Sequence, residues 1–298
     1  MHLLKSISDA IYDNDYPHDV LEIICEYVPH EQRVFCGDDI STILKSDKTL
    51  YSWRDDENDD CLISIIPEGS GFISVAFITY QCIALKGDGT IHCWEDDELM
   101  DIPKGSRFIA ISSDSSYFVA LKDDGTLHST HLHVTPEGSG FIQVSGGMYH
   151  FVALKNDGTL QSWSNNVFSN NQISNTPNES GFVKVSAGGY HSVALKSDGT
   201  LRAWGHDDYN QVSNTPKGSG FIEISAGEYY SVALKDDGTL HSWGFDFGQI
   251  SNTPKGSGFI EISAARCHSV ALKDDGTLHS WGNDTFDQVS GAPKSIYF

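Results

Sequence analysis

A thirteen-residue phrase decides the fold, and its clearest copy reads Ser231-Val232-Ala233-Leu234-Lys235-Asp236-Asp237-Gly238-Thr239-Leu240-His241-Ser242-Trp243. Two runs that favour β-structure flank an Asp-Gly pair in its middle. Because Asp-Gly supplies the positive φ that a tight turn requires, the phrase predicts a β-hairpin. The run at residues 221–226 precedes it and predicts one more strand of the same sheet.

The phrase occurs seven times, at a mean spacing of 38 residues. Its turn position is occupied by Lys48, Gly89, Gly125, Gly158, Gly199, Gly238 and Gly276. A unit of this size cannot bury its apolar face alone, so the units must stack. Small antiparallel sheets repeated in this way are typical of a β-propeller, which has about four to eight blades. We therefore predict an all-β, seven-bladed β-propeller over residues 31–298, with three strands per blade and a fourth, outermost strand left open.

Tryptophan recurs at one position of the repeat, which only the third copy breaks, with Thr130. The residues are Trp53, Trp94, Trp163, Trp204, Trp243 and Trp281. An indole buries a large apolar area, so this recurrence predicts wedges between blades.

The pattern Ala-Gly-x-x-His-Ser-x-Ala-Leu-x-x-Asp-Gly-x-Leu-x-x-Trp-Gly, best seen at residues 187–205 and 226–244, resembles the regulator of chromosome condensation repeat. The resemblance extends over residues 31–298 and implies a seven-bladed propeller. Proteins of that family include a guanine-nucleotide exchange factor for a small GTPase, a UV-B receptor, ubiquitin-ligase subunits and binding scaffolds.

Two of these implied functions conflict with the residues. Exchange relies on a wedge inserted in one blade, whereas no repeat spacing here exceeds 41 residues. The photoreceptor uses tryptophans in a loop that here reads Gly188-Gly189-Tyr190-His191-Ser192. The chain also lacks nucleophile-elbow, P-loop, Rossmann and metalloprotease motifs, so we expect no enzyme, no catalytic residue and no cofactor. The favoured interpretation is a scaffold that binds another protein through a propeller face.

The loop before the His-Ser position supplies candidate binding residues. Corresponding loops of all blades emerge on one face, so their side chains should form an arc around the axis. We expect a partner-binding face at Tyr80, Tyr149, Tyr190, Tyr229 and Arg266. Tyrosine suits this role because it combines a large rigid ring with a hydroxyl group. The alternative is that these rings merely pack beside neighbouring loops.

Histidine is frequent, with 13 residues, and three of them lie at His128, His131 and His133. In a strand, His128 would point away from the other two, so we expect no metal site. Histidines at the third-strand position are expected to be exposed, namely His92, His128, His241 and His279. His150, His191 and His268 are instead expected to fix hydrogen bonds within the blades. The acidic loops at residues 54–60 and 95–101 lack calcium-loop spacing and are interpreted as solvated charge.

The first thirty residues follow a helical period and predict two short helices. Residues 16–29 resemble the opening of an F-box, which recruits substrates to a ubiquitin ligase through a Skp-type adaptor. The resemblance implies that Pro17, Leu21, Ile24 and Val28 face that adaptor. A truncated F-box adaptor is therefore the alternative function, while in the scaffold interpretation the helices cap the propeller.

Composition limits the partners and the compartment. The formal net charge is −22, which opposes binding to DNA. The chain has neither a membrane-length apolar run nor a signal-peptide pattern, so no membrane association is expected. Its six cysteines lack paired spacing and suggest an intracellular protein, cytoplasmic or nuclear. The C-terminal residues 292–298 resemble a truncated eighth repeat that pairs with the first or last blade.

Overall fold

The computed structural model describes residues 34–36, 41–53, 69–78, 81–93, 107–113, 118–129, 135–164, 170–285 and 287–296. The predicted N-terminal helices, the adaptor-binding residues Pro17, Leu21, Ile24 and Val28, and both acidic loops lie outside these ranges. Those expectations therefore stay predictions.

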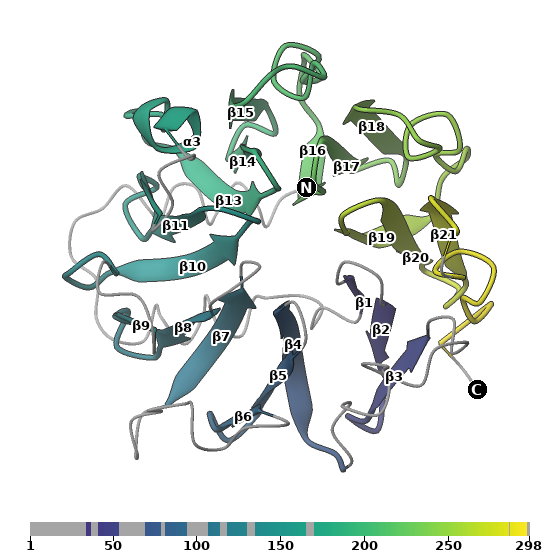
Figure 1. Ribbon diagram of the computed structural model, residues 1–298, viewed down its shortest axis with the longest axis horizontal. Coiled ribbons are helices and arrows are strands. Elements are labelled where there is room, and N and C mark those ends of the chain that lie inside the picture. The colour runs from purple at the N-terminus through teal and green to yellow at the C-terminus, as the bar shows by residue number, and fades with distance from the viewer. Residues whose placement is uncertain are drawn as a thin grey trace. The chain divides into compact units, whose positions relative to one another are not determined.

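The described strands form seven three-stranded antiparallel sheets, which follow one another around a ring (Figure 1). In chain order the strands are β1 (Val34–Cys36), β2 (Ser41–Leu44), β3 (Leu50–Trp53), β4 (Phe72–Ile78), β5 (Gln81–Lys86), β6 (Ile91–Cys93), β7 (Phe108–Ser113), β8 (Phe118–Lys122), β9 (Leu127–His128), β10 (Phe141–Gly146), β11 (Phe151–Lys155), β12 (Leu160–Trp163), β13 (Phe182–Ala187), β14 (His191–Lys196), β15 (Leu201–Gly205), β16 (Phe221–Ala226), β17 (Tyr230–Lys235), β18 (Leu240–Gly244), β19 (Phe259–Ala264), β20 (His268–Lys273) and β21 (Leu278–Gly282). The seven-bladed β-propeller is confirmed. Blades 1 to 7 are numbered in chain order, from β1–β3 to β19–β21.

Each blade contains three strands in the part of the chain that the structure describes. The segment after the third strand forms turns in blades 5 to 7, and in blade 4 it contains the short helix α3 (Asn170–Ser174). The fourth strand that the sequence left open is therefore not formed by these segments.

The hairpin between the second and third strands forms as the phrase predicts. In blade 6, the Asp237 carboxylate accepts hydrogen bonds from the Thr239 backbone N–H, at 2.9 Å, and from its hydroxyl, at 2.6 Å. Gly238 between them has a φ of 77°. A Cβ at this glycine would lie 2.6 Å from the backbone nitrogen of Gly258, so the turn requires glycine for space as well as for conformation.

Strand register defines two faces of the propeller. In blade 6, Phe221 pairs with Lys235, and Ala226 pairs with Ser231. The start of each first strand and the Asp-Gly turn therefore lie on one face, which we call the turn face. The opposite face, which we call the loop face, carries the loops between first and second strands and the segments that follow the third strands.

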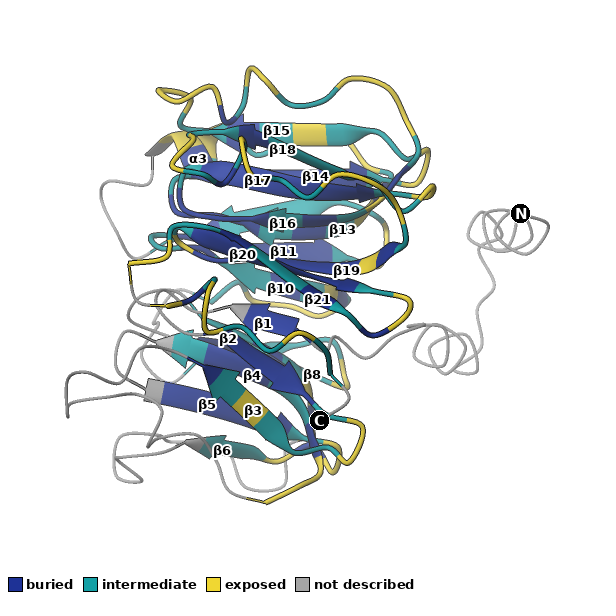
Figure 2. Cartoon of the chain, turned by 90° about the vertical axis from the view of Figure 1, so that its right-hand side faces the viewer, coloured by how far each residue is buried: buried dark blue, intermediate teal, exposed yellow. Residues whose placement is uncertain are grey.

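The hydrophobic core is divided into seven clusters, one between each pair of neighbouring blades. Second strands are buried along most of their length because both of their sides face other blades (Figure 2). In one cluster, Val193 and Leu195 of β14 pack against Phe221, Ile224 and Trp243 of the next blade. The five described tryptophans are buried, as expected for wedges between blades; they are Trp53, Trp163, Trp204, Trp243 and Trp281.

The ring closes through contacts between blades 7 and 1. The backbone N–H of Val34 donates to the Glu261 carboxylate at 2.8 Å, and the indole N–H of Trp53 donates to the Gln288 carbonyl at 3.0 Å. The C-terminal segment pairs with the last blade, where Ser295 bridges Thr277. The Ile296 N–H donates to the Gly276 carbonyl at 3.0 Å, which is the contact that the first strand of a blade makes with the turn of the blade before it, as from Phe259 to Gly238 at 3.2 Å.

Candidate partner-binding face

Buried histidines join neighbouring blades at the loop-face ends of the second strands. Hydrogen bonds connect the Nε2 atom of His150 with Ser192 at 2.6 Å and that of His191 with Ser231 at 2.7 Å. His268 bonds Ser41 across the ring closure at 2.6 Å. The expectation that these histidines fix hydrogen bonds is confirmed, and the bonds run from blade to blade.

Burial keeps these three histidines neutral. Desolvation lowers the pKa of His150 to about 3 and the pKa values of His191 and His268 to about 4. A hydrogen bond between uncharged groups therefore holds each of these blade junctions near neutral pH.

The expectation that the third-strand histidines are exposed was wrong. His92, His128, His241 and His279 are all half-buried. The imidazoles of His241 and His279 lie 5.5 and 5.3 Å from the rings of Phe221 and Phe259, on the first strands of their own blades. The phenylalanine covers the histidine because both side chains project to the same side of the blade.

Close packing brings the loops of successive blades together on the loop face. The Gly189 N–H donates to the Gly227 carbonyl of the next blade at 3.1 Å. A Cβ on Gly188 would lie 2.2 Å from that same carbonyl oxygen. Small residues thus allow a backbone approach that larger ones would prevent, and the side chains that follow them meet.

Six aromatic rings consequently form a continuous series on the loop face, which we call the aromatic ladder. Its members are, in order, Tyr149, Tyr190, Tyr229, Tyr209, Phe245 and Phe247. Successive ring centroids lie 4.5 to 5.1 Å apart, and the Tyr190 and Tyr229 rings are stacked. Offset and edge contacts at such distances stabilise aromatic pairs. The ladder therefore extends from blade 4 to blade 6.

The structure thus brings together three of the four predicted tyrosines. Tyr149, Tyr190 and Tyr229 are half-buried, because each packs on its neighbour while part of its surface remains open. The rings pack beside adjacent loops, as the alternative interpretation has it, and they also line the loop face. Their role in binding a partner stays a prediction. Tyr80 lies outside the described residues.

Hydrogen bonding and burial change the acidity of the tyrosines. The Tyr149 and Tyr190 hydroxyls lie 3.3 Å apart, and this hydrogen bond, with burial, raises the pKa of Tyr149 to about 12. Burial also raises the pKa values of Tyr190 and Tyr229. The three hydroxyls are therefore protonated at physiological pH, with the proton of Tyr190 shared with Tyr149.

A hollow of about 390 Å³ opens at the end of the ladder, between blades 6 and 7. Its lining includes Tyr229, Phe245, Phe247 and Asn283, together with Glu228 and Arg266. The Arg266 Nε donates to the Glu228 carboxylate at 2.8 Å. The Glu228 side chain is buried and that of Arg266 is half-exposed, so the predicted face residue Arg266 contributes a positive charge at the rim of the hollow.

Sequence reasoning missed half of the ladder. Tyr209, Phe245 and Phe247 belong to segments after the third strands, which have no fixed aromatic position in the repeat. Buried glutamines hold two of these residues: the Gln211 side chain accepts the N–H of Tyr209 at 2.9 Å, and that of Gln249 accepts the N–H of Phe247.

The same two glutamines also form hydrogen bonds with tryptophans of the core. Their backbone carbonyls accept the indole N–H groups of Trp243 and Trp281, each at 2.9 Å. A signal for them was present, because Gln172, Gln211 and Gln249 each precede the sequence Ile/Val-Ser-Asn-Thr-Pro.

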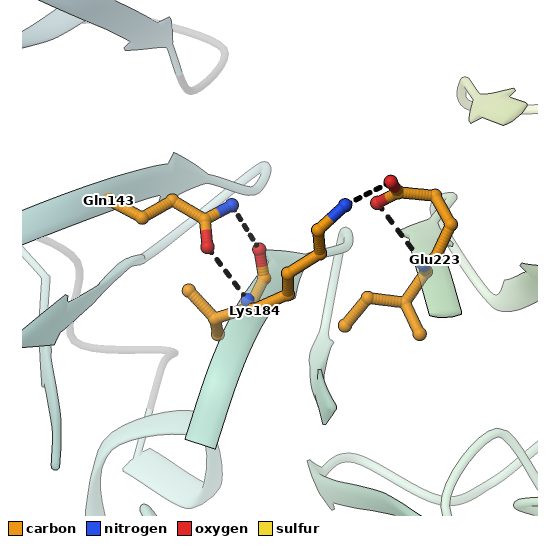
Figure 3. Close-up of polar contacts among 5 residues, drawn as sticks. Gln143, Lys184 and Glu223 are labelled. Carbon is orange, nitrogen blue, oxygen red and sulfur yellow. Dashed lines mark hydrogen bonds and ion pairs between the residues drawn. The ribbon is translucent and has the colours of Figure 1, made fainter. Parts of the chain in front are cut away.

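Polar side chains link the first strands around the axis (Figure 3). The Gln143 amide donates to the Val185 carbonyl and accepts from the Val185 N–H, both at 3.0 Å. Lys184 forms an ion pair with Glu223 of the following blade. These contacts fix the inner strands, and hence the loops at their ends.

For metal-binding groups and membrane-spanning helices, the findings concern the described residues alone. There, no three His, Cys, Asp or Glu side chains gather into a group that could hold a metal ion. His131 and His133 lie outside these residues. The same part of the chain contains no helix with the length and hydropathy of a membrane span.

Comparison with known families now decides the type of repeat. Three stretches match one family, at residues 182–211, 221–249 and 259–288, which correspond to blades 5, 6 and 7. These blades are regulator of chromosome condensation (RCC1) repeats. A sequence comparison with curated proteins found no match.

Solved structures share the fold of this chain. The ectodomain of the Physcomitrella patens receptor kinase CR4 has a TM-score of 0.69 and 19% identity, covering 84% of this chain and 72% of its own. The CRINKLY ectodomain of the Arabidopsis thaliana receptor kinase ACR4 has a TM-score of 0.70 and 18% identity, with coverages of 88% and 98%. Prp20p from Saccharomyces cerevisiae has a TM-score of 0.62 and 16% identity, with coverages of 90% and 88%. At these identities the similarity concerns the fold alone.

Proposed function

We propose that this RCC1-type propeller is a non-enzymatic scaffold that binds a protein partner through its loop face. The aromatic ladder is the observation that carries the proposal. Six adjacent rings offer a large rigid surface with hydroxyl donors, and aromatic residues are enriched where proteins bind one another.

The exposure of the outer ladder residues supports this role. Phe247 is 66% exposed and Tyr209 is 40% exposed, although both lie next to other aromatic rings. These two side chains belong to a contiguous series of rings and are not scattered singly, and contiguous exposed apolar surface is typical of protein interaction sites. Prp20p, which shares the fold, binds the proteins Gsp1p and histones, so a protein partner suits this architecture.

A photocrosslinking experiment tests the proposal. A photoreactive amino acid is placed at Phe247 on the loop face or, as a matched control, at Ile222, which is 47% exposed and lies at the start of β16 on the turn face. In cells that express the protein, we expect a discrete crosslinked protein from position 247 and none from position 222. Adding Tyr190→Ala to the Phe247 probe should abolish that product.

Thermal unfolding of each variant serves as the folding control. The proposal fails if position 247 gives no crosslinked protein, if position 222 gives the same product, or if a folded Tyr190→Ala variant crosslinks as well as the parent.

A further inference from the structure

The charges of the loop face are strongly biased. Near the third-strand ends the described segments of blades 5 to 7 are residues 206–214, 245–252, 283–285 and 287–291, and the described loops between first and second strands are residues 147–150, 188–190, 227–229 and 265–267. In these ranges the acidic residues are Asp207, Asp208, Glu228, Asp246, Asp284 and Asp287, and Arg266 is the one arginine or lysine. Lys217, Lys255 and Lys294 come later in the same segments, where the chain returns to the turn face. The turn face differs, because lysines accompany its turn aspartates: six second strands end there with a lysine, as in Lys196, Lys235 and Lys273, and Lys45 directly follows β2.

The carboxylates are interleaved with the rings of the aromatic ladder. Asp208 precedes Tyr209, and Asp246 lies between Phe245 and Phe247. The Asp208 side chain is 75% exposed. Backbone N–H groups of Ile250, Ser251 and Gly248 lower the pKa of Asp246, so this carboxylate remains ionised. Negative charge beside aromatic faces favours a lysine or arginine side chain, whose stem packs on the rings and whose charge interacts with both.

One cation of the propeller already lies in this region. The Arg266 guanidinium donates to Glu228 at the hollow that Tyr229 and Phe247 also line. Glu228 is thereby compensated, whereas the ranges given above contain no second arginine or lysine for the other five carboxylates, of which Asp208 lies 3.6 Å from the His206 imidazole. An acidic partner segment would be repelled by them, and a basic segment would be attracted.

We propose that the loop face binds a segment rich in lysine and arginine from its protein partner, with the hollow beside Phe247 receiving one cationic side chain. This inference rests on the proposed function and specifies the chemistry of its partner. The occupant is a peptide segment because the ladder extends over three blades, which is farther than one side chain reaches.

Fluorescence anisotropy with two defined probes tests the inference on the full chain. One probe is a labelled fifteen-residue peptide of alternating arginine and glycine, and the other has glutamate in place of arginine. We expect saturable binding of the arginine peptide only, weakened by added salt because exposed charges are screened. Phe247→Ala should weaken this binding by about tenfold.

Charge-matched variants separate a specific site from the general acidity of the chain. The loop-face variant combines Asp208→Asn with Asp287→Asn, and its control combines Asp236→Asn with Asp274→Asn, which are exposed on the turn face. Asn suits Asp287, whose φ is 54°. We expect the loop-face pair to weaken binding by about fivefold and the control pair to change it by less than about twofold.

The inference is overturned by three results: absence of binding, preference for the glutamate peptide, or equal losses in the two paired variants. The first two leave the proposed function standing if position 247 still crosslinks to a partner. Loss of that crosslink from a folded protein, in contrast, removes the proposed function itself.

Discussion

On the turn face, all seven blades end in the same local contact, in which an aspartate accepts from the backbone and hydroxyl of the threonine two residues later. Each turn of blades 1 to 6 also accepts one backbone hydrogen bond from the next blade, as Gly199 does from Phe221 at 3.1 Å. On the loop face, side chains as well as backbone join the blades: His191 bonds Ser231, Gly189 bonds Gly227, and Tyr190 stacks on Tyr229. Both faces thus connect the blades, the turn face through one repeated backbone contact and the loop face through side chains that differ between blades.

The difference shows which face of the propeller can vary from blade to blade and so acquire a specific function. The turn face repeats the same backbone contacts in each blade, with glycine packed against the next blade, so it tolerates little variation. The loop face is assembled from different blades, so substitutions in one repeat change the surroundings of the next. Aromatic and acidic residues specific to single blades have accumulated there.

The largest predicted difference between the two faces is in how acid changes the free energy of unfolding. Histidine in the unfolded chain takes up protons below about pH 6.5, whereas the folded pKa values of His150, His191 and His268 are about 3, 4 and 4. Stability is thus fully present above pH 6.5 and is lost as the pH falls towards those values. With three protons, we expect the free energy of unfolding to decrease by up to ~4 kcal/mol per pH unit between pH 6 and 4.5.

Denaturant unfolding at a series of pH values measures this slope. His191→Gln should reduce the slope by the amount that corresponds to about one proton taken up on unfolding. The turn face responds in a lower window: hydrogen bonds from Thr239 lower the pKa of Asp237 below 3.8, so its contribution is present above that pH and is lost only below it. A free energy of unfolding that is constant from pH 6.5 to 4.5 would contradict the blade junctions described here.

A pair of glycine substitutions compares steric tolerance on the two faces. A Cβ at Gly188 on the loop face would lie 2.2 Å from the Gly227 carbonyl oxygen, whereas one at Gly87 on the turn face would meet only ordinary contacts, 3.6 Å from Ile73. We expect Gly188→Ala to destabilise the protein by about 3 kcal/mol, because the loops must separate. Gly87→Ala should leave stability unchanged or raise it by up to about 1 kcal/mol.

Chemical denaturation measures both values under the same conditions. Equal effects of the two substitutions would mean that the Gly188 loop is packed as loosely as the surroundings of Gly87. Crosslinking at position 247 should also decrease in Gly188→Ala, since displaced loops would separate the rings of Tyr190 and Tyr229.

The sequence predicts the periodic parts of this molecule and misses those that vary. The Asp-Gly turns, the tryptophan wedges and the loop tyrosines recur at fixed repeat positions, so their register could be read from the chain. Tyr209 and Phe247 could not be found in this way, because the segments that carry them differ in length and composition between blades.

Distance along the chain accounts for other misses. The bond from Val34 to Glu261 joins residues 227 positions apart, and only the closed ring brings them together. The half-burial of His241 follows from its position over Phe221, which depends on the orientation of a side chain and not on strand periodicity.

The smallest predicted effect is on the pKa of one tyrosine, Tyr149. It tests whether tyrosine hydroxyls connect neighbouring blades on the loop face. The hydrogen bond with Tyr190, followed by burial and by the charge of Glu228, raises the pKa of Tyr149 from 10 to about 12. The stability that this bond adds is therefore present below pH 10 and is lost as the pH rises through 12. Ultraviolet titration of the phenolate, with Tyr149→Phe as the subtraction control, reports this ionisation.

Tyr190→Phe keeps the ring in blade 5 but removes its hydroxyl, so Tyr149 in blade 4 should then titrate closer to pH 10. The turn-face control is Thr239→Val, which removes the hydroxyl that Asp237 accepts within the same hairpin. This control should leave the titration of Tyr149 unchanged, because Thr239 lies on the opposite face and bonds Asp237 in place of either tyrosine. If Tyr149 titrates near pH 10 in the unmodified protein, the two rings are neighbours without a shared hydrogen bond. Blades 4 and 5 would then be joined on the loop face by the His150–Ser192 and backbone bonds without the tyrosine pair.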